Sequence, residues 1–241
     1  MTESKSILIL FKGGLGATRG EHPWQASIRV YGRSTRTYHW CGASIINHYY
    51  LITAAHCLKD FPKSSYFVRV GDHLLDVRED SEADYEIDEI IFHEKFNLGP
   101  YLNNDIALVK IKSNDSSESG MDFGLYVSPI CLPASNLIYE SDISLNITGW
   151  GKIGYEGPNS EELNLPKRNS QGATIELQIA EVPLIESKVC SGSKVYGKDR
   201  VSVGMFCAGS LEGQFDACQG DSGGPAVVNV QGRATLFGKI V

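Results

Sequence analysis

Short apolar or alternating stretches run along the whole chain, separated by glycine, asparagine and aspartate. This rhythm is typical of an all-β sandwich or barrel protein, and no long amphipathic helix is indicated. The candidate strands are Trp24–Tyr31, Ala43–Ile46, Tyr49–Thr53, Tyr66–Val70, Ile106–Ile111, Leu145–Thr148, Ile175–Pro183 and Ala226–Val230.

Four segments refine this pattern. Asn47-His48 lies between two candidate strands and predicts a tight hairpin. Ile106–Ile111 is almost continuously apolar, which predicts a strand packed on both faces. Two polar segments, Ser113–Gly120 and Tyr155–Gly172, are predicted to be exposed loops because they are rich in turn-forming residues and charge.

Length and charge narrow the classes of protein. The 241 residues are enough for one or two folding units with a sizeable core. The net charge is −7, and the acids concentrate between Asp72 and Glu94, which argues against a nucleic-acid partner. Ile7–Phe11 is the longest apolar run near either end. It is far shorter than the roughly 20 residues that span a bilayer, so no membrane span is expected.

The six cysteines include no C-x-x-C pair, which argues against a zinc site or a redox dithiol. Disulfides formed in an oxidising compartment are therefore expected, although spacing alone leaves 15 connectivities open. The chain carries no recognisable signal peptide. The expected disulfides indicate an extracellular location. Because no signal peptide accompanies them, we expect this sequence to be part of a longer secreted chain.

One glycine-rich segment, Gly220-Asp221-Ser222-Gly223-Gly224-Pro225, surrounds a serine. A serine hydroxyl is a weak nucleophile until an imidazole removes its proton and backbone N–H groups await the oxyanion. A plain glycine-rich turn is the alternative. Leu51–Cys57 and Asn103–Leu108 argue against that alternative because they supply His56 as a base and Asp105 as an acid that orients it.

With these residues the sequence resembles the trypsin/chymotrypsin-like serine endopeptidases from Gly13 to Val241, including the chain order His, Asp, Ser. Cys131, which matches a cysteine that tethers the protease domain to an upstream region, and the residues of several motifs are similar to those of mosaic secreted proteases of the neurotrypsin type. Other segments similar to the family are Gly20–Gln25, Trp40–Gly42, Pro129–Pro133, Gly149–Gly151 and Phe206–Gly209.

The resemblance implies two packed antiparallel β-barrels of the six-stranded type. The expected organisation is an atypical N-terminal extension over residues 1–12 and a peptidase domain over 13–241. Within that domain the first barrel covers about 13–125 and the second about 126–241, and the second is expected to be incomplete at its C-terminus.

The resemblance also implies the roles of the site residues. His56 acts as general base and then general acid, Asp105 holds its tautomer, and Ser222 attacks the scissile carbonyl. The backbone amides of Gly220 and Ser222 form the oxyanion hole. The implied function is endopeptidase hydrolysis through an acyl-enzyme. A catalytically silent homologue that works as a binding or regulatory module is the alternative.

Asp216 matches the residue at the floor of the primary specificity pocket in trypsin-like members. A carboxylate in a desolvated pocket is costly unless it is paired, so it is expected to select Arg or Lys before the cut. The implied partners are protein or peptide substrates of this kind, together with serpin-type or Kunitz-type inhibitors. An ordinary surface aspartate is the alternative.

Asp221 matches the family residue that pairs with a new N-terminal ammonium after zymogen cleavage. The expected Ile-Val-Gly-Gly-like start is replaced here by Leu10-Phe11-Lys12-Gly13-Gly14, and the segment that follows Val241 in the family is missing. The chain therefore looks truncated at both ends, and its own activity is in question.

The family also implies a pairing of cysteines, Cys41 with Cys57 and Cys190 with Cys207. Cys218 is expected to pair with a residue beyond Val241. Cys131 is similar to the cysteine that tethers the protease domain to an upstream region.

No cofactor and no catalytic metal are expected. The acids between Asp72 and Glu82 lie where some relatives have a calcium loop, and clustered oxygen ligands suit Ca²⁺. A solvated acidic loop without an ion is the alternative.

Overall fold

The computed structural model describes residues 6–9, 15–32, 37–112, 120–134, 143–151, 174–192, 196–197, 199–209 and 220–241. The predicted loop at 155–172 lies outside these residues, and so does the predicted loop at 113–120 apart from Gly120. Asp216 and Cys218 also lie outside them.

Strands make up nearly all of the regular structure, which confirms the all-β prediction. The described helical segments are each one turn long: η1 (Ala55–Cys57), η2 (Lys63–Ser65) and α1 (Ser187–Cys190).

The first half of the chain forms a closed barrel in the strand order β3-β4-β5-β8-β7-β6, with every neighbouring pair antiparallel. Its strands are β3 (Gln25–Tyr31), β4 (Thr37–Ile45), β5 (Tyr50–Thr53), β6 (Tyr66–Val70), β7 (Ala83–Phe92) and β8 (Ala107–Ile111). The predicted hairpin joins β4 to β5, and Asn47 Oδ1 accepts backbone N–H groups from Tyr49 and Tyr50. Such a side-chain bond stabilises a tight turn.

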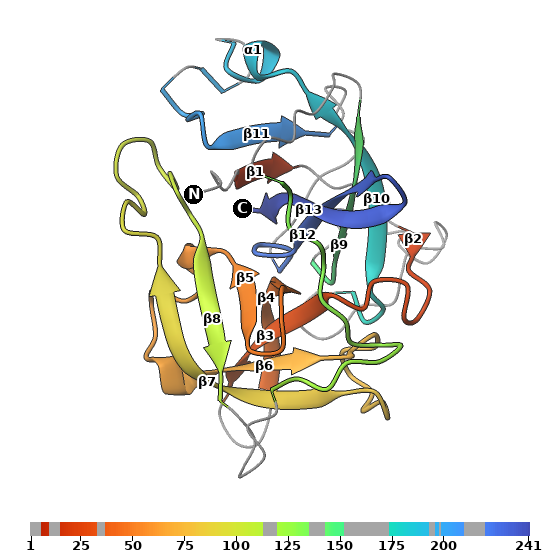
Figure 1. Ribbon diagram of the computed structural model, residues 1–241. Coiled ribbons are helices and arrows are strands. Elements are labelled where there is room, and N and C mark those ends of the chain that lie inside the picture. Colours follow the sequence, from red (N-terminus) through yellow and green to blue (C-terminus); the bar gives the residue numbers. More distant parts are fainter. Residues whose placement is uncertain are drawn as a thin grey trace, which may run out of the picture.

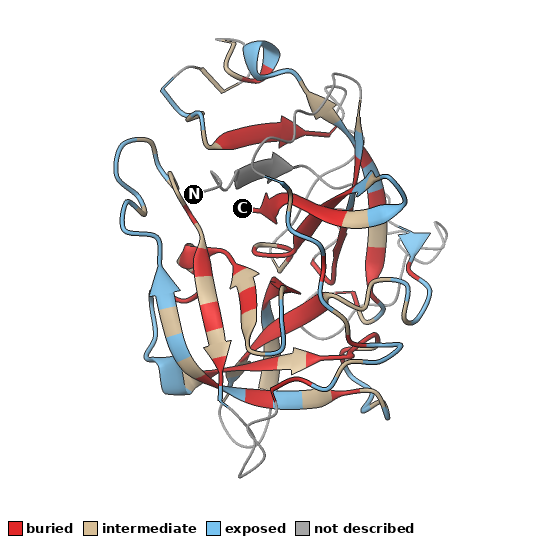
Figure 2. Cartoon of the chain, viewed as in Figure 1, coloured by how far each residue is buried: buried red, intermediate tan, exposed pale blue. Residues whose placement is uncertain are grey.

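The prediction that Ile106–Ile111 packs on both faces is wrong. Along β8, Ala107, Val109 and Ile111 are buried, whereas Leu108 and Lys110 are only partly covered (Figure 2). A barrel strand turns alternate side chains into the core and away from it, so one face of an apolar strand stays outside.

The second half forms a sheet whose pairings also return on themselves. The order is β11-β1-β13-β12-β9-β10, and β10 pairs back to β11, which completes a ring (Figure 1). Its strands are β1 (Ser6–Ile9), β9 (Ser144–Gly149), β10 (Gln178–Ile185), β11 (Met205–Ala208), β12 (Pro225–Val230) and β13 (Arg233–Ile240), with β2 (Leu15–Gly16) added at the edge of β10.

Strand β1 joins the two sides of this ring and comes from the segment expected to be an N-terminal extension. It pairs in parallel with β11 over Ser6–Ile9 and in parallel with β13 at Lys239 and Ile240. All other pairings between named strands of this sheet are antiparallel. The second barrel was expected to be incomplete, and in the structure this N-terminal strand spans the gap between β11 and β13.

The two halves are joined by polar contacts that fix where the second half presents its loops. Thr148 Oγ1 on β9 donates a hydrogen bond to Gln25 Oε1 on β3 at 2.7 Å, and both residues are buried. Trp150 Nε1 donates to His73 O at 3.1 Å. Because a buried polar group is costly without its partner, these bonds hold the halves in one register.

Candidate active site

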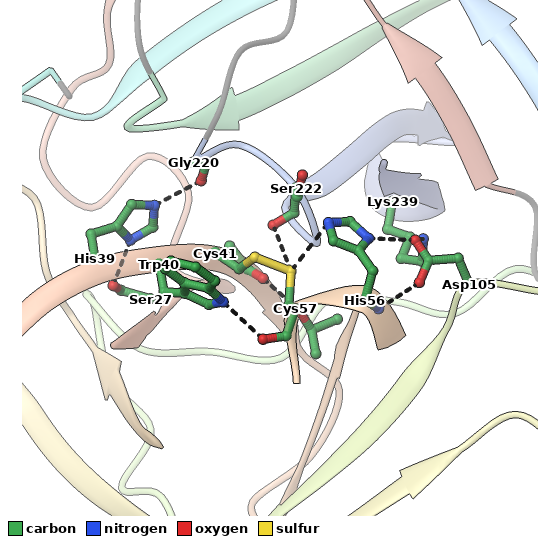
Figure 3. Close-up of a disulfide and its surroundings, with 12 residues drawn as sticks. Ser27, His39, Trp40, Cys41, His56, Cys57, Asp105, Gly220, Ser222 and Lys239 are labelled. Atoms are coloured by element: carbon green, nitrogen blue, oxygen red, sulfur yellow. Dashed lines mark hydrogen bonds and ion pairs between the residues drawn. A yellow bond between two sulfur atoms is a disulfide. The ribbon is translucent and has the colours of Figure 1, made fainter. Parts of the chain in front are cut away.

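His56 and Asp105 come from neighbouring strand ends of the first barrel. His56 lies in the turn η1 directly after β5, and Asp105 precedes β8. Because β5 and β8 pair with Thr53 opposite Ala107, these two ends meet. His56 Nδ1 lies 2.7 Å from Asp105 Oδ2, and the His56 backbone N–H donates to Asp105 Oδ1 at 2.8 Å (Figure 3).

Both carboxylate oxygens of Asp105 therefore serve His56. Asp105 is fully buried, and burial alone raises the pKa of its carboxyl. The hydrogen bonds from His56 and the charge of Lys239 outweigh that effect and hold the Asp105 pKa below its ordinary value. An ionised Asp105 accepts the Nδ1 proton, which leaves Nε2 of His56 as the free base.

Ser222 reaches the same place from the second half, in the loop before β12. Its carbonyl accepts the Gly42 N–H from β4 at 2.8 Å. His56 Nε2 and the Ser222 carbonyl oxygen each lie 3.8 Å from Cys57 Sγ, so both groups contact the same disulfide (Figure 3). Among the described residues, no hydrogen bond joins the Ser222 hydroxyl to His56. Such bonds often form only when substrate is bound.

Glycines allow this loop to approach the first barrel. Gly223 has a φ of +81°, and a Cβ there would lie 2.2 Å from Thr53 Oγ1. A Cβ on Gly42 would lie 2.6 Å from Gly224 Cα. Backbone packed this closely leaves no room for side chains, which explains the glycines around Ser222 in physical terms.

Gly220 is held in place by His39, which the sequence analysis did not single out. His39 Nε2 lies 2.8 Å from the Gly220 carbonyl and therefore carries the proton, while Nδ1 lies 2.7 Å from Ser27 Oγ. Burial lowers the pKa of His39 to about 4, so the ring is neutral at pH 7. Gly220 itself has a φ of +109°, which suits only glycine.

Asp221 is buried beneath the serine loop. Its Oδ1 accepts the Gly151 N–H at 2.7 Å, and a Cβ on Gly149 or Gly151 would collide with its carboxylate. The structure therefore places Asp221 inside the second half rather than in solvent. Its role as a zymogen switch stays a prediction, because residues 10–14 lie outside the described residues.

The described residues contain two disulfides, Cys41–Cys57 and Cys190–Cys207, the pairs that the resemblance implies. The first joins β4 to η1 and so anchors the turn that carries His56. Cys131 is exposed and forms no disulfide with any described cysteine. The expected partner of Cys218 stays a prediction.

The acids near Asp72 form a cluster in which Asp72 and Glu82 are buried and Glu79 is half-buried. Oxygen atoms of Asp72, Glu79 and Glu82 lie within 4.8 Å of one another, which is a donor set that suits Ca²⁺. Burial raises the pKa of Asp72 to about 7, and Asp72 Oδ1 has no hydrogen-bond partner among the described residues.

Arginines already pair with each of these acids, which differs from a simple solvated loop. Arg29 lies 3.2 Å from Asp72, Arg19 lies 3.0 Å from Glu79, and Arg69 and Arg78 each lie 3.0 Å from Glu82. Four guanidinium groups neutralise the charge that would attract a cation. Calcium binding stays a prediction.

The family model described as Trypsin matches residues 11–240. The chain belongs to the trypsin family. It is 36% identical to Trypsin-1 of Astacus astacus over 231 residues, which cover 94% of this chain and 86% of that protein. By family the chain is a serine protease and a hydrolase.

Two mouse relatives are longer than this chain. It is 34% identical to Transmembrane protease serine 11C of Mus musculus, over 89% of this chain and 43% of that protein. It is 31% identical to Hepatocyte growth factor activator serine protease of Mus musculus, over 95% of this chain and 32% of that protein. Within the described ranges of this trypsin-family chain, no helix is long and apolar enough to cross a membrane.

Lys239 is a second site residue that the sequence analysis missed. Its Nζ lies 3.6 Å from Asp105 Oδ2, although the two residues are far apart in the chain. The signal was a lone lysine in the otherwise apolar run Leu236–Val241. A charge in a buried strand needs a partner, but the sequence did not say which acid would supply it.

Proposed function

We propose that this chain hydrolyses peptide bonds after Arg or Lys through an acyl-enzyme, with His56, Asp105 and Ser222 as its catalytic residues. The observation that carries the proposal is the pair of hydrogen bonds that hold His56 on the buried Asp105, with the Ser222 backbone beside the same ring.

In the first step, His56 Nε2 takes the proton of the Ser222 hydroxyl as Oγ attacks the substrate carbonyl carbon. The negative charge that develops on the carbonyl oxygen is received by the N–H groups of Gly220 and Ser222. The imidazolium then gives its proton to the leaving amine, and an ester remains on Ser222. Water, deprotonated by His56, attacks that ester and releases the carboxylic acid.

The preference for Arg or Lys rests on Asp216. A carboxylate in a pocket that excludes water binds a cationic side chain far better than an apolar one, because its own desolvation must be offset. Protein substrates follow from the family. A secreted location is supported by the two disulfides, which persist in oxidising compartments.

A fluorophosphonate probe tests the nucleophile without a substrate. We expect Ser222 Oγ to attack the phosphorus of the probe, which expels fluoride and leaves a phosphonyl ester on Ser222, and peptide mass spectrometry locates the adduct. Ser222→Ala is expected to abolish labelling, whereas Ser64→Ala, at an exposed serine, is the matched control. Labelling that persists in Ser222→Ala would overturn the assignment.

Arginyl, lysyl and phenylalanyl amides then test turnover and specificity separately. Hydrolysis of only the basic amides supports Asp216 as the specificity residue, and Asp216→Ser is expected to remove that preference. Hydrolysis of only the phenylalanyl amide would contradict the role of Asp216 and keep the triad. No labelling and no hydrolysis would favour the silent homologue.

A further inference from the structure

Lys239 lies at the boundary between the two halves and reaches into the catalytic pair. Its side chain is 1% exposed, and Asp105 beside it is fully buried. Lys239 pairs through its backbone with Ser6 of β1 on one side and with Pro225 of β12 on the other. Strand pairing on both sides leaves the lysine little freedom to turn away from Asp105.

The carboxylate oxygen that Lys239 approaches is the one that holds the His56 ring. Oδ2 of Asp105 lies 2.7 Å from His56 Nδ1 and 3.6 Å from Lys239 Nζ (Figure 3). Lys239 Nζ has no hydrogen bond within the described part of the chain. The ammonium is therefore close enough for a strong ionic interaction yet not fully satisfied by it.

The ammonium of Lys239 changes the net charge beside the His56 ring. During acylation His56 becomes an imidazolium, and Asp105 stabilises it by one negative charge. While Lys239 is protonated, the Asp105–Lys239 pair carries no net charge, so the imidazolium is stabilised less. When Lys239 is neutral, the full negative charge of Asp105 stabilises the imidazolium.

We propose that Lys239 is a positioning residue that restrains catalysis, because its ammonium shares Asp105 with His56 until it loses its proton. This inference deepens the proposed function and rests on it. Its chemistry involves one proton only, which Lys239 gives to solvent as the pH rises.

The surroundings of Lys239 contain few competing charges. Of the described ionisable groups, Asp105 is the one that lies within ion-pair distance of Lys239, and His56 lies on the other side of the same carboxylate. The paired strands β1 and β12 carry no ionisable residue, and His93 lines a cavity of about 600 Å³ that Lys239 borders. Burial lowers the pKa of Lys239 to about 8, although Asp105 favours its charged form. Lys239 is therefore expected to lose its proton between about pH 7 and 9.

The test compares the wild type with Lys239→Met, which keeps length and removes charge, and Lys239→Arg, which keeps the charge at every pH. The first readout is NMR titration of the His56 ring in the full chain, which needs no turnover. We expect Lys239→Met to move the titration midpoint upward by about one pH unit. Lys239→Arg is expected to leave it near the wild-type position.

The second readout is kcat against pH on an arginyl amide. The wild type is expected to gain about tenfold in kcat as pH rises through 8, with little change in KM, because the effect lies in the transition state. Lys239→Met is expected to have the higher kcat already at pH 7, and Lys239→Arg to lack the rise.

The outcomes separate the two proposals. An unchanged His56 midpoint in Lys239→Met overturns the role of Lys239, whether or not the chain is active. A shifted midpoint without turnover in any variant supports the coupling and overturns the proposed function. If Lys239→Met fails to fold, Lys239→Gln removes the same charge and carries the same expectations.

Discussion

The two halves of the molecule reach a ring of strands by different routes. The first barrel uses one continuous stretch of chain, from β3 to β8, with antiparallel pairs throughout. The second half joins β9–β13 with β1, which arrives from the other end of the chain and pairs in parallel. The first barrel is therefore built from neighbouring segments, whereas the second depends on distant ones.

The halves also treat buried charge differently. In the first barrel, Arg29 and Asp72 are both nearly inaccessible and form an ion pair inside a wider network of acids and arginines. In the second, the buried Lys239 finds its partner, Asp105, in the first barrel. The comparison teaches that Arg29 and Asp72 neutralise each other within the first barrel, whereas Lys239 of the second half finds its partner across the boundary, in Asp105.

The largest expected effect concerns the reaction that the halves share. We expect Ser222→Ala and His56→Ala each to lower kcat by about 10⁶-fold, because residues that act as a unit fail together. The double variant is expected to lose little more. Rates on an arginyl amide measure this, with Ser64→Ala as the control. Losses that multiply in the double variant would mean that the two halves act separately.

Arg29→Met tests the buried ion pair inside the first barrel. The change leaves Asp72 buried without its partner, and we expect the free energy of unfolding to fall by about 4 kcal/mol. Urea denaturation measures it, with Arg233→Met at an exposed site as the matched control. Adding Asp72→Asn is expected to restore part of the loss. A neutral Arg29→Met would remove the contrast between the halves.

Lys239→Met is expected to raise the free energy of unfolding, whereas Arg29→Met is expected to lower it. Folding lowers the pKa of Lys239 from its ordinary value to about 8, so below pH 8 the folded chain holds a costly buried charge. Removing it is expected to stabilise the chain by about 3 kcal/mol at pH 7.

The pH dependence of this gain follows from proton binding. Between about pH 8 and 10 the unfolded chain holds a proton on Lys239 that the folded chain has lost, so wild-type stability rises with pH. The advantage of Lys239→Met is expected to shrink towards zero over that window. Urea denaturation at pH 7, 8, 9 and 10 checks it, and a constant difference would contradict the assignment.

Deleting residues 1–12 tests the dependence of the second half on β1. We expect a loss of about 2 kcal/mol, since each net backbone hydrogen bond contributes about 1 kcal/mol or less. Hydrogen exchange is expected to speed up in β11 and β13 and to stay unchanged in β8. Deletion of residues 1–5 keeps β1 and is the control. Equal protection in both deletions would show that β1 contributes nothing.

The smallest expected effect is that of calcium. Because arginines pair with Asp72, Glu79 and Glu82, we expect 5 mM CaCl₂ to leave the Tm within about 1 °C of its value in chelator. Glu79→Gln is the control for specific binding. A rise of several degrees that Glu79→Gln removes would establish a calcium site.

Part of the fold was readable from local pattern. Tyr66–Val70 was predicted with the observed bounds, and Asn47 marked the β4–β5 turn. Strand β7 was not predicted because its many acidic residues obscure the alternation that buries Tyr85 and Ile87. Strand β2 has too few residues for a pattern of its own, and β1 and β11 pair with each other from distant parts of the chain.

By itself the sequence determined the fold class, the family, and which histidine, aspartate and serine to examine, because these depend on local spacing and on residue types that strict geometry demands. Only the tertiary structure decided that β1 spans the gap in the second half, that arginines neutralise the acidic cluster, and that Lys239 reaches Asp105. Such contacts depend on which distant side chains share one buried volume. Strand periodicity says whether a residue points inward, and only packing says what it meets there.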